Sequence, residues 1–273
     1  MIVDLAHLDR MARELRGLII EMTHQAKPAH LASALSCVDI VTVLYWTILK
    51  IDPARPLAPE RDRFILSKGH AALTLYAALT KRGFCSAEDL RTFNTNGGRL
   101  AEHPGLQCLP GVEAATGSLG HGLPLAVGMS LAARLGNQPS RVFALMSDGE
   151  CNEGSVWEAA MFAAGQKLGN LCAIIDFNKW QATGRSQEVL QLDPLPEKWA
   201  SFGWDTVRLD GHDHRALHEC LSHHGTGRKR PLAIIADTVK GKGVSFMEDD
   251  NNWHYRVPTA DEVTAAKKEL GLA

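Results

Sequence analysis

The stretch MSDGECNEG, residues 146–154, places acidic and amide side chains directly behind an apolar run. Asp148 follows the β-prone run 141–146, and Asn178 follows the next apolar run, 171–176. Mg²⁺ prefers octahedral coordination by oxygen, which carboxylates, amides and carbonyls supply. Two side-chain oxygens, one backbone carbonyl beyond Asn178 and water would leave room for two phosphate oxygens. One interpretation is therefore a metal–diphosphate site.

The same residues also have a plain structural interpretation. Asp, Asn and Gly are the usual residues of turns and caps, so Asp148-Gly149 could form a turn and Asn178 could cap a helix. Residue types and spacing leave both interpretations open.

The second half of the chain alternates continuous apolar runs with helical patterns. Such runs are typical of a parallel sheet covered by helices on both faces, so we expect an α/β fold. Ligands of these sheets bind beyond the carboxyl ends of the strands. The crossover rule places runs 141–146 and 171–176 side by side or nearly so. The expected strands are residues 64–66, 141–146, 171–176, 205–209 and 231–239.

The first half is mainly helical in pattern. Apolar residues recur at helical spacing over residues 5–25, and Pro28 then breaks the pattern. We expect Ser33 or Ser36 to cap a second helix that reaches about Ile48. Residues 94–122 are rich in Gly and Pro, and a loop of that length is usually functional or disordered.

Length and composition restrict the function classes. The 273 residues suffice for one large α/β domain, and we expect a single domain over 1–273. The net charge of −2 gives no indication of a nucleic-acid partner, and no apolar run approaches membrane-spanning length. The six cysteines lack C-x-x-C spacing and are interpreted as reduced thiols. We therefore expect a cytoplasmic protein.

Four ordered stretches carry a family resemblance that covers essentially the whole chain. SDGECNEGSVWEAAMFAAGQKLGNLCAIIDFNKW resembles the thiamine-diphosphate motif in its transketolase version. DRFILSKGHAALTLYAAL, HPGLQCLPGVEAATGSLGHGLPLAVG and TVKGKGVSFMEDDNNWH resemble three further transketolase segments, in the same order. The chain thus resembles the N-terminal, diphosphate-binding half of a transketolase, with the thiamine-diphosphate-binding fold.

The resemblance implies thiamine diphosphate with Mg²⁺, or Ca²⁺ or Mn²⁺ in its place. The implied metal ligands are the side chains of Asp148 and Asn178 and the carbonyl of Trp180. Gly149 would let the backbone approach a phosphate, since a Cβ would crowd the cofactor. The other implied cofactor-binding residues are His70, Gly117, Ser118, Leu119 and His254.

The implied catalytic residues are mainly histidines, whose protons move near neutral pH. His30 and His103 match histidines that contact the donor sugar, and His254 would assist proton transfer. Glu153 matches a glutamate that reaches toward the partner subunit, although helix N-terminal charge complementation also explains it. The histidines expected to be structural are His7, His24, His212, His214, His218, His223 and His224.

The chain departs from the family pattern at three places. Ser147 stands where Gly normally precedes Asp148, and His121 replaces the common Gln. KPAHLASALS replaces a Gly-rich G-S-G-H-x-G-G loop, so Pro28 stiffens a loop that usually bends freely. This change calls the usual role of His30 and the usual substrate into question.

The resemblance also implies a partner. Transketolases take a glutamate and the pyrimidine pocket from a second domain, and the 34 residues (273 − 239) after the last expected strand hold no such domain. We expect a partner subunit carrying the pyrimidine domain, an α2β2 heterotetramer, and transfer of a two-carbon ketol unit between sugar phosphates.

Three alternatives remain at this point. An α subunit of a 2-oxoacid dehydrogenase uses the same cofactor but usually has a second Asn where Lys179 stands. A non-catalytic cofactor-binding subunit would not need the four retained histidines. A nicotinamide-binding Rossmann domain would need G-x-G-x-x-G after a strand, which is absent from the sequence.

Overall fold

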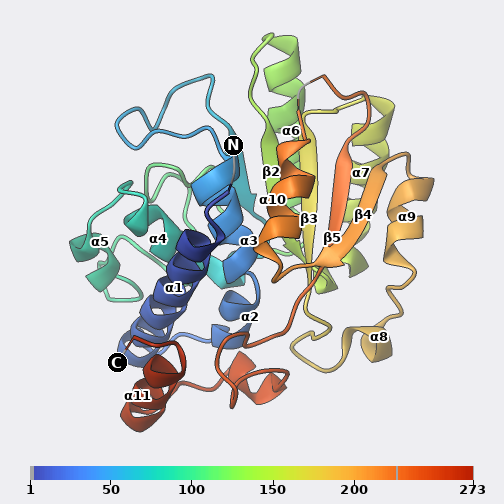
Figure 1. Ribbon diagram of the computed structural model, residues 1–273. Helices are drawn as coiled ribbons and strands as arrows, with labels where there is room; N and C mark the ends of the chain where they lie inside the picture. Colours follow the sequence, from blue (N-terminus) through green and yellow to red (C-terminus); the bar gives the residue numbers. More distant parts are fainter. Residues whose placement is uncertain (1–2, 226, 273) are drawn as a thin grey trace.

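A five-stranded parallel sheet forms the centre of the computed structural model, which describes residues 3–225 and 227–272 (Figure 1). The strand order is β1-β2-β3-β5-β4, and every neighbouring pair is parallel. All five expected strands are present, which confirms the predicted fold class. The strands are β1 Arg63–Leu66, β2 Val142–Ser147, β3 Leu171–Phe177, β4 Asp205–Asp210 and β5 Leu232–Asp237.

Helices cover both faces of the sheet, and each face has its own apolar core (Figure 1). Alternate side chains of a strand point to opposite faces, so Phe143 and Leu145 pack on one core and Ala144 and Met146 on the other. The first face is covered by α1 Leu5–Ala26, α2 Leu31–Ser36, α3 Val38–Val43, α4 Ala72–Lys81 and α10 His214–Ser222. The second face is covered by α6 Gly122–Leu135, α7 Gly154–Gly165 and α9 Leu195–Ser201.

Shorter elements connect these layers. They lie mostly in loops at the sheet ends, apart from η1, which continues α3 as one π-helical turn. They are η1 Leu44–Ile48, η2 Gly69–Ala71, α5 Ala87–Arg91, η3 Gly149–Asn152, α8 Ser186–Val189 and η4 Asn251–His254. The longer helix α11, Ala260–Glu269, lies near the C-terminus and packs against α1.

The pairing of β2 with β3 positions the acidic stretch. Ser147 lies opposite Asp176 in the register, so the residues that follow each strand leave the sheet side by side. This confirms that the runs before Asp148 and Asn178 are neighbouring strands.

The second helix begins earlier than expected. Neither Ser33 nor Ser36 caps it, because α2 starts at Leu31 and both serines are buried inside it. His30 precedes the helix in a left-handed conformation, with φ 72°. The serines instead serve long-range contacts, since Ser36 Oγ donates to Asp176 Oδ2 at 2.6 Å.

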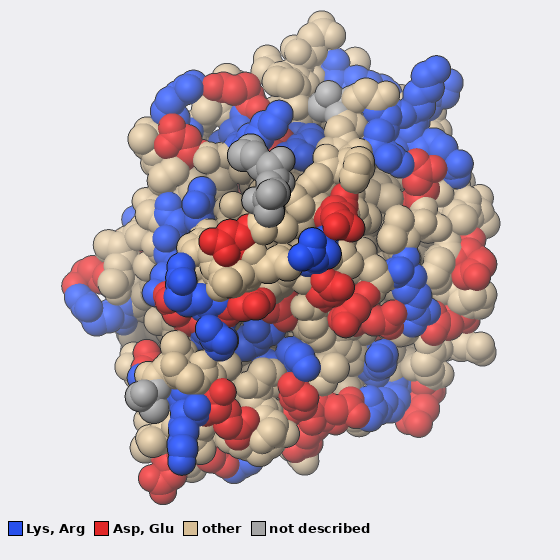
Figure 2. Space-filling view, in the orientation of Figure 1, with Lys and Arg blue, Asp and Glu red and all other residues tan. Residues whose placement is uncertain are grey.

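The surface carries charges of both signs. On the face shown in Figure 2, basic and acidic side chains are interspersed without a large patch of one sign. Within residues 3–225 and 227–272, the helices are all too short or too polar to cross a membrane.

Candidate functional site

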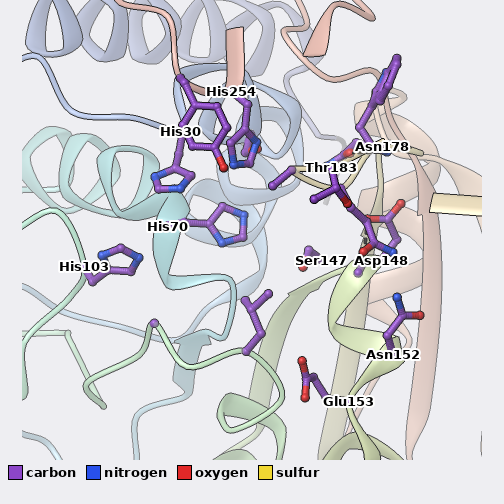
Figure 3. A pocket seen from close by; sticks show the side chains of 18 residues that line it. His30, His70, His103, Ser147, Asp148, Asn152, Glu153, Asn178, Thr183 and His254 are labelled. Atoms are coloured by element: carbon purple, nitrogen blue, oxygen red, sulfur yellow. Dashed lines mark hydrogen bonds between the residues drawn. The ribbon is translucent and has the colours of Figure 1, made fainter. Parts of the chain in front are cut away.

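A cavity of about 480 Å³ opens at the carboxyl end of the sheet (Figure 3). It gathers residues from the ends of β1, β2 and β3 and from two distant loops, as expected for a parallel sheet. Of the implied site residues, those that line it are His30, His70, His103, Gly117, Leu119, Asp148, Gly149, Glu153, Asn178, Trp180 and His254. Ser118 lies instead in a neighbouring cavity, which it shares with Gly117 and His121.

Asp148 is a fully buried carboxylate without a basic partner in the described part of the chain. Its Oδ1 accepts the Gly149 N–H at 2.8 Å. Its Oδ2 accepts the Lys179 N–H at 2.9 Å and the Ser186 hydroxyl at 2.8 Å. Burial raises the pKa of Asp148 to about 6. A cation bound in the cavity would supply the missing charge, so this carboxylate fits a metal ligand.

Asn178 and Trp180 place two more oxygens beside Asp148. Asn178 Oδ1 accepts the Trp180 N–H at 3.1 Å, which fixes both residues in one tight turn. The hydrogen bonds found among the described residues do not use the Trp180 carbonyl oxygen. The Trp180 ring is held in place because its Nε1–H donates to Asp249 Oδ1 at 2.7 Å. The donor set is therefore all oxygen, as Mg²⁺ prefers.

The floor beside Asp148 suits a diphosphate. A Cβ on Gly149 would come within 3.3 Å of the Gln181 side chain, so glycine keeps this part of the cavity open. Gln181 Nε2 is a buried donor and Asn152 Oδ1 a buried acceptor, and neither has a protein partner among the described residues. Such orphaned polar atoms indicate that a ligand completes their hydrogen bonds. No sequence pattern points to Gln181 beyond its position shortly after Asn178.

Four histidines form the opposite wall (Figure 3). The His30 ring centre lies 5.4 Å from that of His70, 5.9 Å from that of His103 and 4.8 Å from that of His254. Residues separated by more than 200 positions thus meet, as the family resemblance implies for these histidines.

Two of these histidines, His70 and His254, are held neutral by their surroundings. Burial, the charge of Lys240 and nearby His30 lower the pKa of His254 to about 3. Burial and the charge of Lys68 hold the pKa of His70 well below its usual range. Neutral imidazole can both donate and accept a hydrogen bond, which suits orienting hydroxyl groups.

A buried ion pair supports the histidine wall from behind. Lys68 Nζ and Asp176 Oδ2 are in contact, and both side chains are fully buried. Lys68 also donates to the Ser33 carbonyl at 2.8 Å, which ties α2 to the end of β1. Burial alone would lower the pKa of Lys68, but the charge of Asp176 raises it. Lys68 lies in the family-like segment, but its partner could not be predicted from the sequence.

The acids of the SDGECNEG stretch have different roles. Glu150 is fully buried and ties three segments together, because it accepts the Ser67 hydroxyl, the Gly120 N–H at 3.0 Å and the Ser147 N–H at 3.0 Å. Glu153 is exposed and lines the cavity edge next to the start of α7. Glu150 therefore shapes the site, while Glu153 faces outward.

The seven histidines expected to be structural lie outside this cavity. His212 and His214 both contact Asp39, at 2.7 Å and 3.0 Å, beside the Arg16–Asp39 ion pair. Burial would raise the pKa of Asp39, but Arg16 and the two histidines hold it well below its usual range. This cluster joins α1, α3 and α10 and has no access to the cavity.

Comparison with known proteins supplies the family. Residues 8–273 match the family described as "Transketolase, thiamine diphosphate binding domain". A relative from Phocaeicola vulgatus, named as one subunit of an apulose-4-phosphate transketolase, is 39% identical over 96% of this chain and 93% of the relative. The "6-deoxy-6-sulfo-D-fructose transketolase subunit SqwG" of a Clostridium species is 39% identical over 98% of this chain and 96% of the relative.

A solved structure agrees. The transketolase of Campylobacter jejuni superposes with a TM-score of 0.93 and 28% identity, covering 98% of this chain and 43% of that longer chain. These matches favour transketolase over the 2-oxoacid dehydrogenase alternative. The chain belongs to the transketolase family, as its thiamine-diphosphate-binding part.

Proposed function

We propose that this chain is the diphosphate-binding subunit of a two-subunit transketolase. The enzyme transfers a two-carbon ketol unit from a ketose or ketose phosphate to an aldose or aldose phosphate. The observation that carries the proposal is one cavity in which the buried carboxylate of Asp148 and the amide of Asn178 face four histidines. A non-catalytic subunit would have no use for that histidine wall.

One set of residues binds the metal ion, and a second set faces the diphosphate. Asp148, Asn178 and the Trp180 carbonyl hold Mg²⁺, for which Ca²⁺ or Mn²⁺ can substitute. Gly149 and Gln181 face the diphosphate, and the α7 N-terminus adds positive potential nearby. Bound thiamine diphosphate supplies the nucleophilic carbon that accepts the ketol unit.

The histidines act on the sugar. His30, His103 and His254 hydrogen-bond its hydroxyl groups and move protons between oxygens as the carbon–carbon bond breaks and forms. The His70 ring centre lies 5.4 Å from that of His30 and 6.5 Å from that of His254, where the ring would contact the bound cofactor.

A partner subunit completes the site. Both relatives described above are named as subunits and match this chain over nearly their whole length, whereas the C. jejuni enzyme is more than twice as long. We propose that residues 1–273 act as one diphosphate-binding domain. The partner carries the pyrimidine domain and the glutamate that activates the cofactor, and Glu153 at the cavity edge contacts it. The assembly is an α2β2 heterotetramer.

The free cysteines support a location in a reducing compartment of the cell. All six cysteines are free, and three of them are buried in the apolar cores. Free thiols persist in reducing compartments, so we place the enzyme in the cytoplasm.

The test is reconstitution. This chain is purified alone and together with a pyrimidine-domain subunit encoded nearby, and ketol transfer is measured with thiamine diphosphate and Mg²⁺. We expect turnover only with both chains. Full turnover by this chain alone contradicts the two-subunit proposal, and release of CO₂ from a 2-oxoacid contradicts the reaction.

The donor sugar needs a substrate panel. The two relatives are named for different sugars at the same 39% identity, so resemblance alone selects neither. The panel should include ketose phosphates and a sulfonated ketose, compared by kcat/KM.

A further inference from the structure

The loop before α2 departs from the family pattern, yet it delivers His30 into the cavity. His30 has φ 72°, a left-handed conformation that is uncommon for a residue with a side chain. The usual loop is rich in glycine, whereas here Pro28 and Ala29 precede His30. Contacts from elsewhere must therefore hold the loop in this shape.

Glu102, in the loop between α5 and α6, holds the loop before α2. Its Oε1 accepts the Ala29 backbone N–H at 3.0 Å and lies 3.2 Å from His30 Nδ1. The His30 backbone N–H donates to the His254 carbonyl at 2.5 Å. One carboxylate oxygen thus fixes both the backbone before His30 and one nitrogen of its ring.

The partner of each ring determines where its proton sits. An ionised carboxylate only accepts hydrogen bonds, so a bond to Glu102 requires the proton on Nδ1 of His30. The opposite holds for His254, because Lys240 Nζ lies 2.9 Å from its Nδ1 and an ammonium group only donates. Lys240 is fully buried and is also held by Asn251 Oδ1 at 2.6 Å.

We infer that Glu102 and Lys240 are positioning residues that set His30 and His254 in opposite tautomers. His30 then presents an unprotonated Nε2, and His254 presents an Nε2–H, with ring centres 4.8 Å apart. One sugar hydroxyl between them donates to His30 and accepts from His254. The two rings therefore select both the position of the hydroxyl group and the direction in which its O–H bond points. This inference rests on the proposed function for the identity of the ligand.

The surroundings of His30 keep its ring neutral. Burial lowers its pKa, although Glu102 opposes that shift. The titratable and charged groups that face it are Glu102, His70, His103, Lys240, His254 and Tyr255. Glu102 is the one carboxylate in that set, so it is the group that stabilises the tautomer of His30 with its proton on Nδ1.

The test reads the two rings directly. Long-range ¹H–¹⁵N correlation spectra are recorded at neutral pH on the full chain labelled with ¹⁵N-histidine. Variants His30→Gln and His254→Gln each lose one set of signals and so assign the rings. We expect a protonated Nδ1 for His30 and a protonated Nε2 for His254.

Variants at position 102 test the cause. Glu102→Leu removes the acceptor, so a large share of His30 should move its proton to Nε2 while His254 is unchanged. Glu102→Gln keeps a carbonyl oxygen at the same reach and should preserve the native pattern. Glu88→Gln, an exposed carboxylate on α5, is the matched control for loss of charge and should change nothing.

Any of three results overturns the inference: a native His30 with its proton on Nε2, a native His254 with its proton on Nδ1, or a His30 tautomer that Glu102→Leu leaves unchanged. If Glu102→Leu does not fold, the native and Glu102→Gln spectra still decide, because each must show a protonated Nδ1. The spectra need neither partner nor turnover. Failure of ketol transfer with the expected tautomers present would therefore contradict the proposed function alone.

In the assembled enzyme the same variants separate positioning from folding. Loss of directed hydrogen bonding should lower kcat more than it raises KM in Glu102→Leu, with recovery in Glu102→Gln. Equal loss in both variants would contradict a positioning role.

Discussion

The two ends of the sheet both carry buried charge. We call the amino end closed, because its buried charges are paired within the chain, and the carboxyl end open, because a buried charge there is not. At the amino end, Arg141 and Asp62 pair at 2.6 Å, and the Arg141 and Lys50 backbone N–H groups also donate to Asp62 at 2.9 Å. The remaining guanidinium hydrogens reach the carbonyls of Ile48 and His224. Both of these buried charges have internal partners.

At the carboxyl end the balance is incomplete. Lys68 and Asp176 pair with each other, but Asp148 accepts hydrogen bonds only from neutral donors among the described residues. Within the described part of the chain, Glu150 also accepts only from neutral donors, but Asp148 lines the cavity and Glu150 does not, so of these two carboxylates Asp148 is the one that a bound cation can reach. Removal of one partner from an internally paired buried charge lowers stability, whereas removal of a charge that only a bound cation satisfies lowers affinity for that cation.

Asp62→Asn should have the largest effect on stability. The variant leaves Arg141 buried with an unpaired charge, so the free energy of unfolding should fall by about 3–5 kcal/mol. Urea denaturation followed by circular dichroism measures the loss. The folded fraction should bind Mg²⁺ and thiamine diphosphate as the native chain does, and a loss of affinity in that fraction would contradict the division between the two ends.

Asp148→Asn should show the reverse pattern. The amide keeps the size of the side chain and removes a buried charge that destabilises the metal-free chain above about pH 6, so the unfolding free energy at pH 7 should not fall. Metal-dependent affinity for thiamine diphosphate should fall at least about 100-fold, or about 2.7 kcal/mol. Isothermal titration calorimetry measures the affinity, and an unchanged value rules out Asp148 as a metal ligand.

Acid should weaken binding at the open end. The pKa of Asp148 is raised to about 6 by burial, and the protonated carboxyl does not bind metal. Affinity should therefore be flat above pH 7 and about tenfold lower at pH 5, since each pH unit below the pKa removes about tenfold of the ionised form.

The raised pKa of Asp148 should also make the free energy of unfolding of the metal-free chain depend on pH. A folded-state pKa raised above the ordinary Asp value gives stability that is present at low pH and lost as pH rises through about 6. Asp148→Asn should remove this dependence. Affinity that stays constant from pH 7 to pH 5 would contradict a metal site at Asp148.

Residue patterns predicted the sheet because its central strands, β2, β3 and β5, are continuous apolar runs. β2 and β3 are buried at every position, so no alternation obscured them. The pairing of Asp148 with Asn178 followed from strand adjacency, and the motif resemblance supplied the histidines. Local residue patterns were sufficient for the strands and for this pairing, and the histidines needed the family resemblance.

Contacts between distant segments were not predictable. Ser33 and Ser36 have the residue types of caps, but contacts with Lys68 and Asp176 draw them into the core. Glu102 is one acid in a long loop, and its contact with His30 spans 72 positions. Only the folded chain brings such pairs together, and most of the support behind the cavity walls is of this kind.

The smallest expected effects also compare the two ends, because at each end a buried serine donates a hydrogen bond to a side-chain oxygen. Ser186 Oγ donates to Asp148 Oδ2 at 2.8 Å at the open end, and Ser130 Oγ donates to Asn170 Oδ1 at 2.6 Å at the closed end. Each Ser→Ala change should lower the unfolding free energy by about 1 kcal/mol. Ser186→Ala alone should also lower metal affinity about tenfold, because it loosens the orientation of a ligand. Equal affinities in the two variants would mean that the Asp148 carboxylate needs no second partner to hold the metal.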